Sequence, residues 1–548
     1  MKIIILLILF FLSLAWLLPN HYQPWLAAYQ DFSAYIAAIL VCIACLIKNS
    51  NIKVPFFILF SLLIFLVPVV QYYLGVIYFF GDFVLNFLYL FSFFIMVIIG
   101  FNYGGYDKNR KVIYFYFSSL LIFASVISVW ICLRQWLLIG GNIWTVDMPP
   151  YGRPFANMAQ PNQLATLLAM GCIATIYLYE EKYIGNFTSV FLLLFIVFGV
   201  ALTQSRTPWV MCLFLAIWWC WKSRYFNPRL KLGCLLSFIF VYVIYILILP
   251  FIAEALGVNS ISDVVTRATT GMNRLDLWRV ALTALNNSTF WGFGWGQSPV
   301  AQMTISHIFP NPSREIMGYS HNLFLEILIW NGIWIGSLII IVIIVCFFKL
   351  VCRARSLDSV IGLMFIGVVL THAMLEYPLA YAYYLLPVGF ILGLIYGELI
   401  AVNNFITLSN KFSAIFISFG VVLMILVWVD YRKVEVDHRL LRFELLRVGT
   451  LKAEQKSPDV FILTQLSEYI WAARTKPVAG MSDEDIERIR KVAYRYPDGF
   501  LVYKYIMVLY LNDRHALINN EIIKFNGLYN QNINIDDLMQ EKIIIPRY

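Results

Sequence analysis

The sequence predicts an all-α polytopic membrane protein that ends in a water-soluble helical tail, and three observations predict this. The 548 residues are 61% hydrophobic and 13% charged, whereas soluble domains carry about 25% charged residues. Charge is concentrated at the end of the chain, because 18 of the 40 Lys and Arg residues and 16 of the 31 Asp and Glu residues lie within 431–548. Long apolar stretches fill the rest. We therefore expect a transmembrane domain over 1–430 and a soluble domain over 431–548.

The predicted transmembrane helices number about thirteen. A helix needs about 20 mainly apolar residues to cross a bilayer. The first stretch could be a signal peptide, but no small-residue cleavage site precedes Pro19, so we interpret it as a retained span. The stretches are approximately 3–18, 32–47, 54–70, 83–100, 112–133, 162–179, 187–203, 208–221, 232–252, 322–348, 357–375, 380–399 and 413–430.

The distribution of Lys and Arg predicts the orientation. If the N-terminus is cytoplasmic, 15 of the 22 Lys and Arg residues within 1–430 flank the cytoplasmic ends of the spans. Cytoplasmic loops normally carry this excess of basic residues. After an odd number of spans the tail then lies in the periplasm. We expect a multi-pass protein of a bacterial inner membrane with a cytoplasmic N-terminus and a periplasmic C-terminal domain.

Two connections on the predicted periplasmic side are long, at about 134–161 and 253–321. They are rich in Trp, Tyr, Phe and Gly, so we expect ordered loops that partly lie against the membrane. The spacing of apolar residues over Leu275–Asn286 predicts a short amphipathic helix. In the tail, Ser482 is expected to cap a helix, and alternating helices through Tyr494 and Tyr510 predict a degenerate helical repeat.

Nucleic acid, metal and redox functions have little support. No basic run interleaved with aromatic residues accompanies the net charge of +9, so we attribute this charge to membrane topology. Cys42 and Cys45 form a Cys-x-x-Cys pair, but inside an apolar stretch without further ligands. Asp483 and Asp485 are better explained by helix capping than by metal binding. We therefore expect neither a metal nor a cofactor.

Unusual polar residues of the membrane domain all fall on the predicted periplasmic side. Charges in a membrane domain are costly, roughly 2.5–3.5 kcal/mol at the bilayer centre, and are usually functional. Each group alone has a simpler explanation, such as snorkelling, helix capping or an aromatic belt. His21, His307 and His372 lack a comparable polar setting. The groups are Gln160-Pro161-Asn162-Gln163, Thr203–Thr207 with Arg206, the loop arginines Arg267, Arg274 and Arg279, Ser320-His321-Asn322, and Glu376-Tyr377.

Arginines and a histidine on one side of the membrane suit a diphosphate substrate at the lipid–water boundary. The guanidinium fork matches phosphate oxygens with two parallel hydrogen bonds. No Asp/Glu cluster on this side is expected to hold a divalent ion, so we expect arginine to neutralise the diphosphate. Histidine is the natural general base at neutral pH.

Five segments carry a resemblance to a known family. Arg153-Pro-Phe-Ala-Asn-Met-Ala-Gln-Pro-Asn-Gln-Leu-Ala-Thr-Leu-Leu168 resembles the signature of bacterial protein O-oligosaccharyltransferases of the PglL type. These enzymes share a superfamily with O-antigen ligases and O-antigen polymerases. Glu376-Tyr-Pro-Leu379 also resembles the PglL branch. Three further segments resemble the superfamily core. They are Thr203-Gln-Ser-Arg-Thr-Pro-Trp209, Asn273-Arg-Leu-Asp-Leu-Trp278 with the downstream Gly-Phe-Gly-Trp-Gly, and Ser320-His-Asn-Leu-Phe-Leu-Glu326.

The resemblance implies a glycosyltransferase that moves a whole glycan from undecaprenyl diphosphate to Ser or Thr of a periplasmic protein such as a pilin. It implies that His321 is the catalytic base or the group that orients the acceptor, and that Arg206 and Arg274 hold the diphosphate and stabilise its leaving charge. Direct displacement by the acceptor hydroxyl predicts inversion at the anomeric carbon. The remaining substrate-binding candidates are Gln160, Tyr377, Arg279 and Glu326.

Two other functions stay open. The same chemistry with a different acceptor would make the protein an O-antigen ligase, acting on lipid A-core, or an O-antigen polymerase. The Gln-Pro-Asn segment favours the protein ligase. A transporter of lipid-linked glycans is an alternative of a different class, but transporters place ionisable groups near the bilayer midplane, whereas these groups lie on one side.

Overall fold

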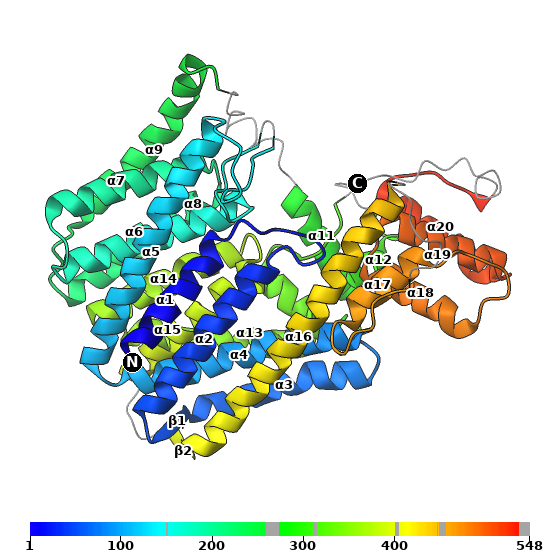
Figure 1. Cartoon of the computed structure of the whole chain (residues 1–548), viewed down its shortest axis with the longest axis horizontal. Helices are drawn as coiled ribbons and strands as arrows, with labels where there is room; N and C mark the ends of the chain where they lie inside the picture. Colours follow the sequence, from blue (N-terminus) through cyan, green and yellow to red (C-terminus); the bar gives the residue numbers. More distant parts are fainter. Residues whose placement is uncertain are drawn as a thin grey trace. The chain divides into compact units, whose positions relative to one another are not determined.

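The computed structural model of the chain is almost entirely helical in the part that it describes (Figure 1). One small antiparallel sheet departs from the all-α prediction. It consists of β1 (Asn51–Pro55) and β2 (Phe405–Ser409), with Asn51 paired with Ser409. The described residues are 1–149, 152–258, 273–310, 315–399, 405–446, 448 and 456–535.

The chain divides into two compact units. The first comprises Met1–Phe60, Phe91–Thr270 and Val345–Val421, and the second comprises Ser61–Leu90, Gly271–Ile344 and Val422–Tyr548. Four of the five boundaries between the units fall within helices, which are α3 (Phe56–Tyr73), α4 (Phe80–Gly104), α13 (Leu323–Arg353) and α16 (Asn410–Leu445), and the fifth lies outside the described residues.

The first unit is built around α6 (Pro161–Glu180), which is buried along almost its whole length. It packs against α5, α7, α8 and α14, and Figure 1 shows α5, α6 and α7 side by side. The other helices of this unit are α1 (Lys2–Leu17), α2 (Ala28–Lys48), α5 (Asp107–Trp136), α7 (Asn186–Leu202), α8 (Thr207–Lys222), η1 (Ser223–Tyr225), α9 (Leu232–Ala255), α14 (Leu357–Ala373), η2 (Pro378–Ala380) and α15 (Ala382–Leu399).

The helices make the chain a multi-pass membrane protein. Among the described residues, eight helices are long and apolar enough to cross a membrane, namely α2, α4, α5, α6, α9, α13, α15 and α16. The apolar helices α1, α7, α8 and α14 are shorter, at 16 or 17 residues. Each predicted apolar stretch overlaps a helix, while the number of thirteen crossings stays a prediction.

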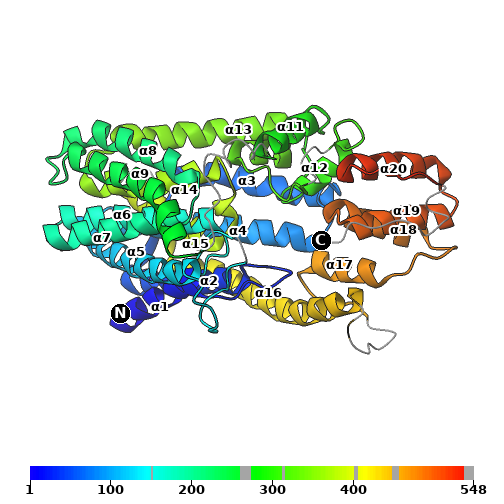
Figure 2. The same cartoon turned by 90° about the horizontal axis from the view of Figure 1, so that it is seen from above.

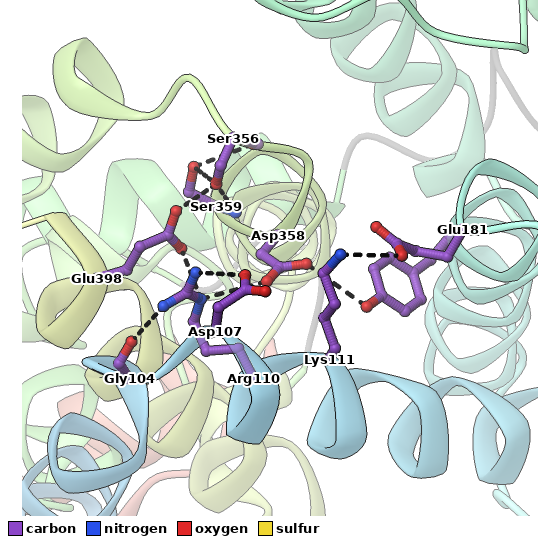
Figure 3. A network of polar contacts seen from close by, with 10 residues as sticks. Gly104, Asp107, Arg110, Lys111, Glu181, Ser356, Asp358, Ser359 and Glu398 are labelled. Atoms are coloured by element: carbon purple, nitrogen blue, oxygen red, sulfur yellow. Dashed lines mark hydrogen bonds and ion pairs between the residues drawn. The ribbon is translucent and has the colours of Figure 1, made fainter.

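Arg110 of α5 lies at the centre of an ion-pair network in the first unit (Figure 3). Its Nε lies 3.2 Å from Asp358 Oδ2 and 3.5 Å from Glu398 Oε2. Its Nη2 lies 3.0 Å from Asp107 Oδ1, and its Nη1 donates to the carbonyl of Gly104 at 2.7 Å. These contacts join α4, α5, α14 and α15 at their ends. Asp358 is near the start of α14. Since a helix rises 1.5 Å per residue, the network lies about 20 Å from the C-terminal end of α14.

The second unit contains α11 (Asn273–Asn286), α12 (Ser298–Ile305) and the helices of the tail. The tail helices α17 (Thr464–Arg474), α18 (Asp483–Arg495), α19 (Gly499–Leu511) and α20 (His515–Tyr529) pack side by side in sequence order (Figure 2). Ser482 caps α18 by accepting from Asp485 N at 3.1 Å, as predicted. α11 confirms the predicted amphipathic helix. The tail shares one core with α12, formed by Val300, Met303, Ile489, Val502, Ile506, Leu509, Ile518 and Phe525 among others.

A kink in α13 fixes the glycine-rich run Trp291–Gly296. Gly332 has φ 73° and ψ 169°, which interrupts the helix and frees carbonyls of the preceding turn. The carbonyls of Ile329 and Trp330 accept from the backbone N–H groups of Phe293 at 2.9 Å and Gly294 at 3.1 Å. This run is thus hydrogen-bonded through its backbone to α13.

Candidate functional site

In the first unit, the turn between α7 and α8 presents Arg206. Gln204 adopts a left-handed conformation with φ 49°, and Arg206 is the exposed residue immediately before α8. Ser205 donates its backbone N–H to Thr203 Oγ1 at 3.2 Å and accepts from Thr207 N at 3.3 Å. Hydroxyl groups therefore satisfy the backbone of a tight turn, which fixes the position from which the Arg206 side chain leaves the helix end.

Asn162, on the first turn of α6, connects this turn to a second predicted group. Its Nδ2 donates to Glu376 Oε1 at 3.0 Å, and its Oδ1 accepts from the hydroxyl of Ser205. Arg206 directly follows Ser205, and Tyr377 directly follows Glu376. The structure therefore brings the Arg206 and Tyr377 segments together around the start of α6. We did not single out Asn162 from the sequence, although it belongs to the Gln-Pro-Asn segment.

Gln160 belongs to the same end of the unit. It is the N-cap residue of α6, with Pro161 in the first turn, but its side chain makes no capping hydrogen bond. Its side-chain carbonyl oxygen is buried, and within the described ranges no hydrogen-bond partner contacts it. The ring of Tyr377 is half-buried and stacks on Tyr381 with 6.0 Å between ring centroids. Gln160 thus offers an acceptor atom, and Tyr377 a partly exposed phenol, near the turn that carries Arg206.

The expectation that His372 lacks a polar setting is wrong. This side chain is fully buried, and its Nδ1 lies 2.8 Å from Thr166 Oγ1, one turn along α6 from Asn162. Its backbone carbonyl accepts from Glu376 N at 2.8 Å. Glu376 lies three residues beyond the end of α14, so its contact with the His372 carbonyl belongs to the turn after the helix, and the partner Thr166 comes from α6, which no local sequence pattern indicates.

His21 also has polar neighbours, contrary to expectation. Its Nε2 lies 2.7 Å from the carbonyl of Asn157 and 3.3 Å from Gln30 Nε2, in the connection between α1 and α2. Burial lowers the pKa of this imidazole below its ordinary value of 6.5, although the hydrogen bonds to Asn157 and Leu26 act in the opposite direction. Its contacts join the α1–α2 connection to the α5–α6 connection, which describes a structural histidine.

In the second unit, His321 lies in a left-handed turn at the start of α13. Its φ of 56° is uncommon for a residue other than glycine. The turn is held on both sides, because Ser320 N donates to Glu326 Oε2 at 2.5 Å and Asn322 Oδ1 accepts from Leu325 N at 3.1 Å. Strained backbone of this kind persists where the surrounding structure determines it, and it is frequent at functional sites.

Glu326, predicted to bind substrate, is buried beneath this turn. Its Oε2 accepts from the backbone N–H of Ser320, and its Oε1 accepts from the hydroxyl of Ser298. Ser298 in turn accepts from Trp330 Nε1 at 3.2 Å. Both carboxylate oxygens thus bind groups of the protein, which fits a residue that positions the His321 turn. A direct contact with substrate stays a prediction.

Arg274 and Arg279 lie on α11. Arg274 is half-buried in the first turn, whereas the Arg279 side chain is 68% exposed and lies 3.3 Å from Asp276 Oδ1. Arg267 lies outside the described residues. α11 packs against the start of α13 and the segment before His321, in a core that includes Leu277, Val280, Ala281, Ala301, Met317 and Ile329. The second unit therefore holds α11 and the His321 turn in one core.

Chemically, the first unit offers the exposed Arg206 before α8, and the second unit offers the half-buried Arg274 on α11 and the half-buried His321 before α13. Within the described ranges, no group of three or more His, Cys, Asp or Glu residues is arranged to hold a metal ion. Arginine side chains match the oxygens of a phosphate or diphosphate. Such residues suit the binding of a phosphorylated lipid and proton removal from a hydroxyl.

Three protein families match consecutive parts of the chain. A protein glycosylation ligase family matches residues 154–179, which include Gln160 and Asn162. An O-antigen ligase family matches residues 191–340, which include Arg206, Arg274 and His321. A family described as the C-terminal part of a virulence factor membrane-bound polymerase matches residues 360–519.

Two curated proteins of Acinetobacter baylyi (strain ATCC 33305 / BD413 / ADP1) are similar over nearly their whole length. A general O-oligosaccharyltransferase is 29% identical over 545 residues, which cover 98% of this chain and 94% of that protein. A ComP-specific O-oligosaccharyltransferase is 29% identical over 535 residues, which cover 96% of this chain and 95% of that protein.

Proposed function

We propose that this chain, an oligosaccharyltransferase homologous to the O-oligosaccharyltransferases over its full length, transfers a whole glycan from undecaprenyl diphosphate to Ser or Thr hydroxyls of a periplasmic protein such as a pilin. The observation that carries this proposal is the 29% identity to two such enzymes over 96–98% of the chain. The match to a protein glycosylation ligase at 154–179 supports a protein acceptor.

His321 is the proposed general base. A Ser or Thr hydroxyl is too weakly acidic to ionise at neutral pH, so its proton must leave as its oxygen attacks the anomeric carbon. A positioned histidine accelerates such a step about 10²–10⁴-fold. The left-handed turn held by Glu326 supports this role, because it fixes the backbone from which the imidazole extends. Direct displacement then inverts the configuration of the anomeric carbon.

Arg206 and Arg274 are the proposed diphosphate ligands. The undecaprenyl diphosphate leaves with developing negative charge, which two guanidinium groups stabilise without a metal ion. Gln160 and Tyr377 complete the donor site through the polar atoms at the start of α6 and after α14. Arg279 is exposed and close to Asp276, so we assign it to the outer edge of the site, where it attracts the diphosphate.

The proposed topology places this chemistry in the periplasm of a bacterial inner membrane. Thirteen crossings from a cytoplasmic N-terminus put Arg206, Arg274 and His321 on the periplasmic side, together with the C-terminal domain. The 15 basic residues at the opposite helix ends support this orientation. A lipid-linked donor and an exported protein acceptor are both available on that side.

An O-antigen ligase or polymerase is the second candidate, because an O-antigen ligase family matches 191–340 and a virulence factor membrane-bound polymerase family matches 360–519. The three activities differ in their acceptor. Deleting the gene and measuring pilin mass and the lipopolysaccharide ladder separates them. We expect the glycan mass to disappear from the pilin while the ladder is unchanged. A lost ladder with unchanged pilin mass would reject the protein acceptor.

A purified preparation tests the enzyme against the transporter. Wild-type protein in liposomes, given undecaprenyl-diphosphate-linked glycan and acceptor pilin, is expected to transfer the glycan. Arg206→Ala and Arg274→Ala are expected to weaken donor binding as well as turnover, because each removes a cation from the diphosphate. Normal donor affinity in both variants would remove their assigned role, and no transfer by the wild type would favour transport.

A further inference from the structure

A closed ring of hydrogen bonds joins the first turn of α6 to the last turn of α14. Asn162 Nδ2 donates to Glu376 Oε1 at 3.0 Å, and Glu376 N donates to the carbonyl of His372 at 2.8 Å. His372 Nδ1 lies 2.8 Å from Thr166 Oγ1, which donates to the carbonyl of Asn162 at 3.1 Å. These contacts are buried, so water does not compete for them.

The ring fixes the direction of its hydrogen bonds. A carboxylate only accepts, so the Asn162 amide must direct its NH2 at Glu376 and its oxygen at the hydroxyl of Ser205. The single proton of Thr166 is given to the Asn162 carbonyl, so His372 Nδ1 donates to Thr166. Asn162 therefore acts as a donor toward one segment and as an acceptor toward the other.

Asn162 acts through its neighbours. It is buried, with 6% of its surface exposed, so it has little surface to offer a substrate. Its two partners each precede a proposed substrate-binding residue, because Ser205 precedes Arg206 and Glu376 precedes Tyr377. A shift of the amide would therefore move both of these residues.

We infer that Asn162 is a positioning residue, which sets the Arg206 turn against the Tyr377 segment by bridging Ser205 and Glu376, and that this bridge governs use of the lipid diphosphate donor. The inference rests on the proposed function. The bridge needs a donor on one side and an acceptor on the other, which an asparagine supplies and an aspartate does not. Exchanging the donor and the acceptor between positions 162 and 376 should preserve the bridge.

The test is an exchange of donor and acceptor across the Asn162–Glu376 contact. Asn162→Asp places two carboxylates face to face, and Glu376→Gln alone leaves an amide oxygen that still accepts. In the double variant, the new amide donates to the new carboxylate, while Ser205 keeps its acceptor. Transfer rates are measured against the concentration of undecaprenyl-diphosphate-linked glycan. Thr175→Val, further along α6 and also buried, is the matched control.

We expect Asn162→Asp to lower kcat/KM for the donor by about tenfold or more, since residues in direct contact are energetically coupled. In the double variant, kcat/KM for the donor should recover to within about threefold of the wild-type value. Thr175→Val should have the wild-type kcat/KM. The inference would be overturned if Asn162→Asp had the wild-type kcat/KM for the donor. It would also be overturned if the double variant lost as much kcat/KM as Asn162→Asp. An inactive wild type would instead reject the proposed function.

Should Asn162→Asp not yield folded protein, Asn162→Ser answers the same question. A serine side chain is too short to bridge Ser205 and Glu376 but adds no charge. The tenfold loss of kcat/KM, with an unfolding midpoint close to that of Thr175→Val, is the expected result. A kcat/KM for the donor equal to that of the wild type would contradict the positioning role.

Discussion

Glu326 accepts the backbone N–H of Ser320 at 2.5 Å, and this bond holds the peptide that leads into His321. The same carboxylate accepts from the hydroxyl of Ser298 on α12. The left-handed conformation of His321 is thus tied to the first turn of α13 and to a neighbouring helix. A base that must take a proton at the moment of attack benefits from such fixation, because small displacements cost large factors in rate.

The first prediction concerns this carboxylate. Glu326→Gln removes one acceptor, so an NH2 group must face either Ser298 or the N–H of Ser320. We expect kcat to fall about 10- to 100-fold with little change in donor KM, because His321 loses its orientation while the donor contacts remain. Initial rates at saturating and limiting donor measure this.

Thr304→Val is the matched control for Glu326→Gln. Thr304 is a partly buried residue of α12 whose hydroxyl donates to the carbonyl of Val300 at 2.7 Å, within the same helix. It should behave as wild type. A rise in donor KM at unchanged kcat in Glu326→Gln would instead indicate that Glu326 contacts the donor, as the sequence first predicted.

The second prediction concerns the kink of α13. Gly332 occupies a backbone region that is essentially restricted to glycine, and a Cβ there would lie 2.6 Å from the carbonyl oxygen of Phe290. Gly332→Ala should therefore destabilise the second unit by at least about 1–3 kcal/mol. Gly233→Ala in α9, where a Cβ meets nothing within 4 Å, is the control. Equal thermal unfolding midpoints in detergent for the two variants would disprove this.

The third prediction concerns the attachment of the tail within the second unit. Arg495, at the end of α18, forms a bidentate ion pair with Asp82 in the first turn of α4, at 2.8 and 2.9 Å. Asp82→Asn leaves the guanidinium without its counter-ion in a mostly buried place, at a cost of about 3–5 kcal/mol. We expect faster tryptic cleavage within the tail.

The exposed pair between Arg514 and Asp483 provides the control for this experiment. The Asp483 side chain is 82% exposed, and surface pairs contribute about 0–1 kcal/mol. Asp483→Asn should leave the rate of tryptic cleavage nearly unchanged. Identical cleavage rates for Asp82→Asn and wild type would show that the bidentate pair does not hold the tail.

The fourth prediction concerns pH. Lys504 donates to the carbonyls of Ala472 and Ala473 at the end of α17, and burial lowers its pKa from 10.5 to about 8. Above about pH 8 the unfolded chain still holds this proton while the folded chain releases it, so stability rises with pH in this window. Burial raises the pKa of Tyr469, whose effect is opposite but begins near pH 10.

Thermal unfolding between about pH 8 and about pH 9.5 measures this effect. The midpoint of the wild type should rise by about 2–4 °C over the window, whereas Lys504→Met, which cannot titrate, should show a flatter dependence. Parallel curves for the two proteins would show that Lys504 keeps its proton in the folded tail.

Much of the helical framework follows from the sequence, because a chain in lipid must satisfy its backbone hydrogen bonds within helices. The positions of helix ends follow less well. The apolar stretch predicted at 413–430 is part of α16, which continues to Leu445. Hydropathy indicates where a segment stops being apolar, but the helix itself can continue into a charged segment beyond that point. The β1–β2 pair was not predicted, since it joins strands over 350 residues apart in the chain.

The candidate site was predicted in part. Topology placed Gln160, Arg206 and Tyr377 on one side, and the contacts of Asn162 bring their segments together. The Asn162 bridge itself depends on the packing of α6 against α8 and α14, which no local pattern encodes. His372 was dismissed because only its sequence neighbours were considered, whereas its polar partner Thr166 is 206 residues away. Tertiary contacts of this kind are outside the reach of spacing rules.

The most direct test of the central claim is glycan transfer by His321→Ala in liposomes, measured together with donor binding. The wild type should move the glycan from undecaprenyl diphosphate to a Ser or Thr of the acceptor protein. His321→Ala should bind the donor normally and transfer at least about 10²-fold more slowly, as expected for loss of a general base. Transfer by His321→Ala at the wild-type rate would contradict the assignment of His321 as the catalytic base.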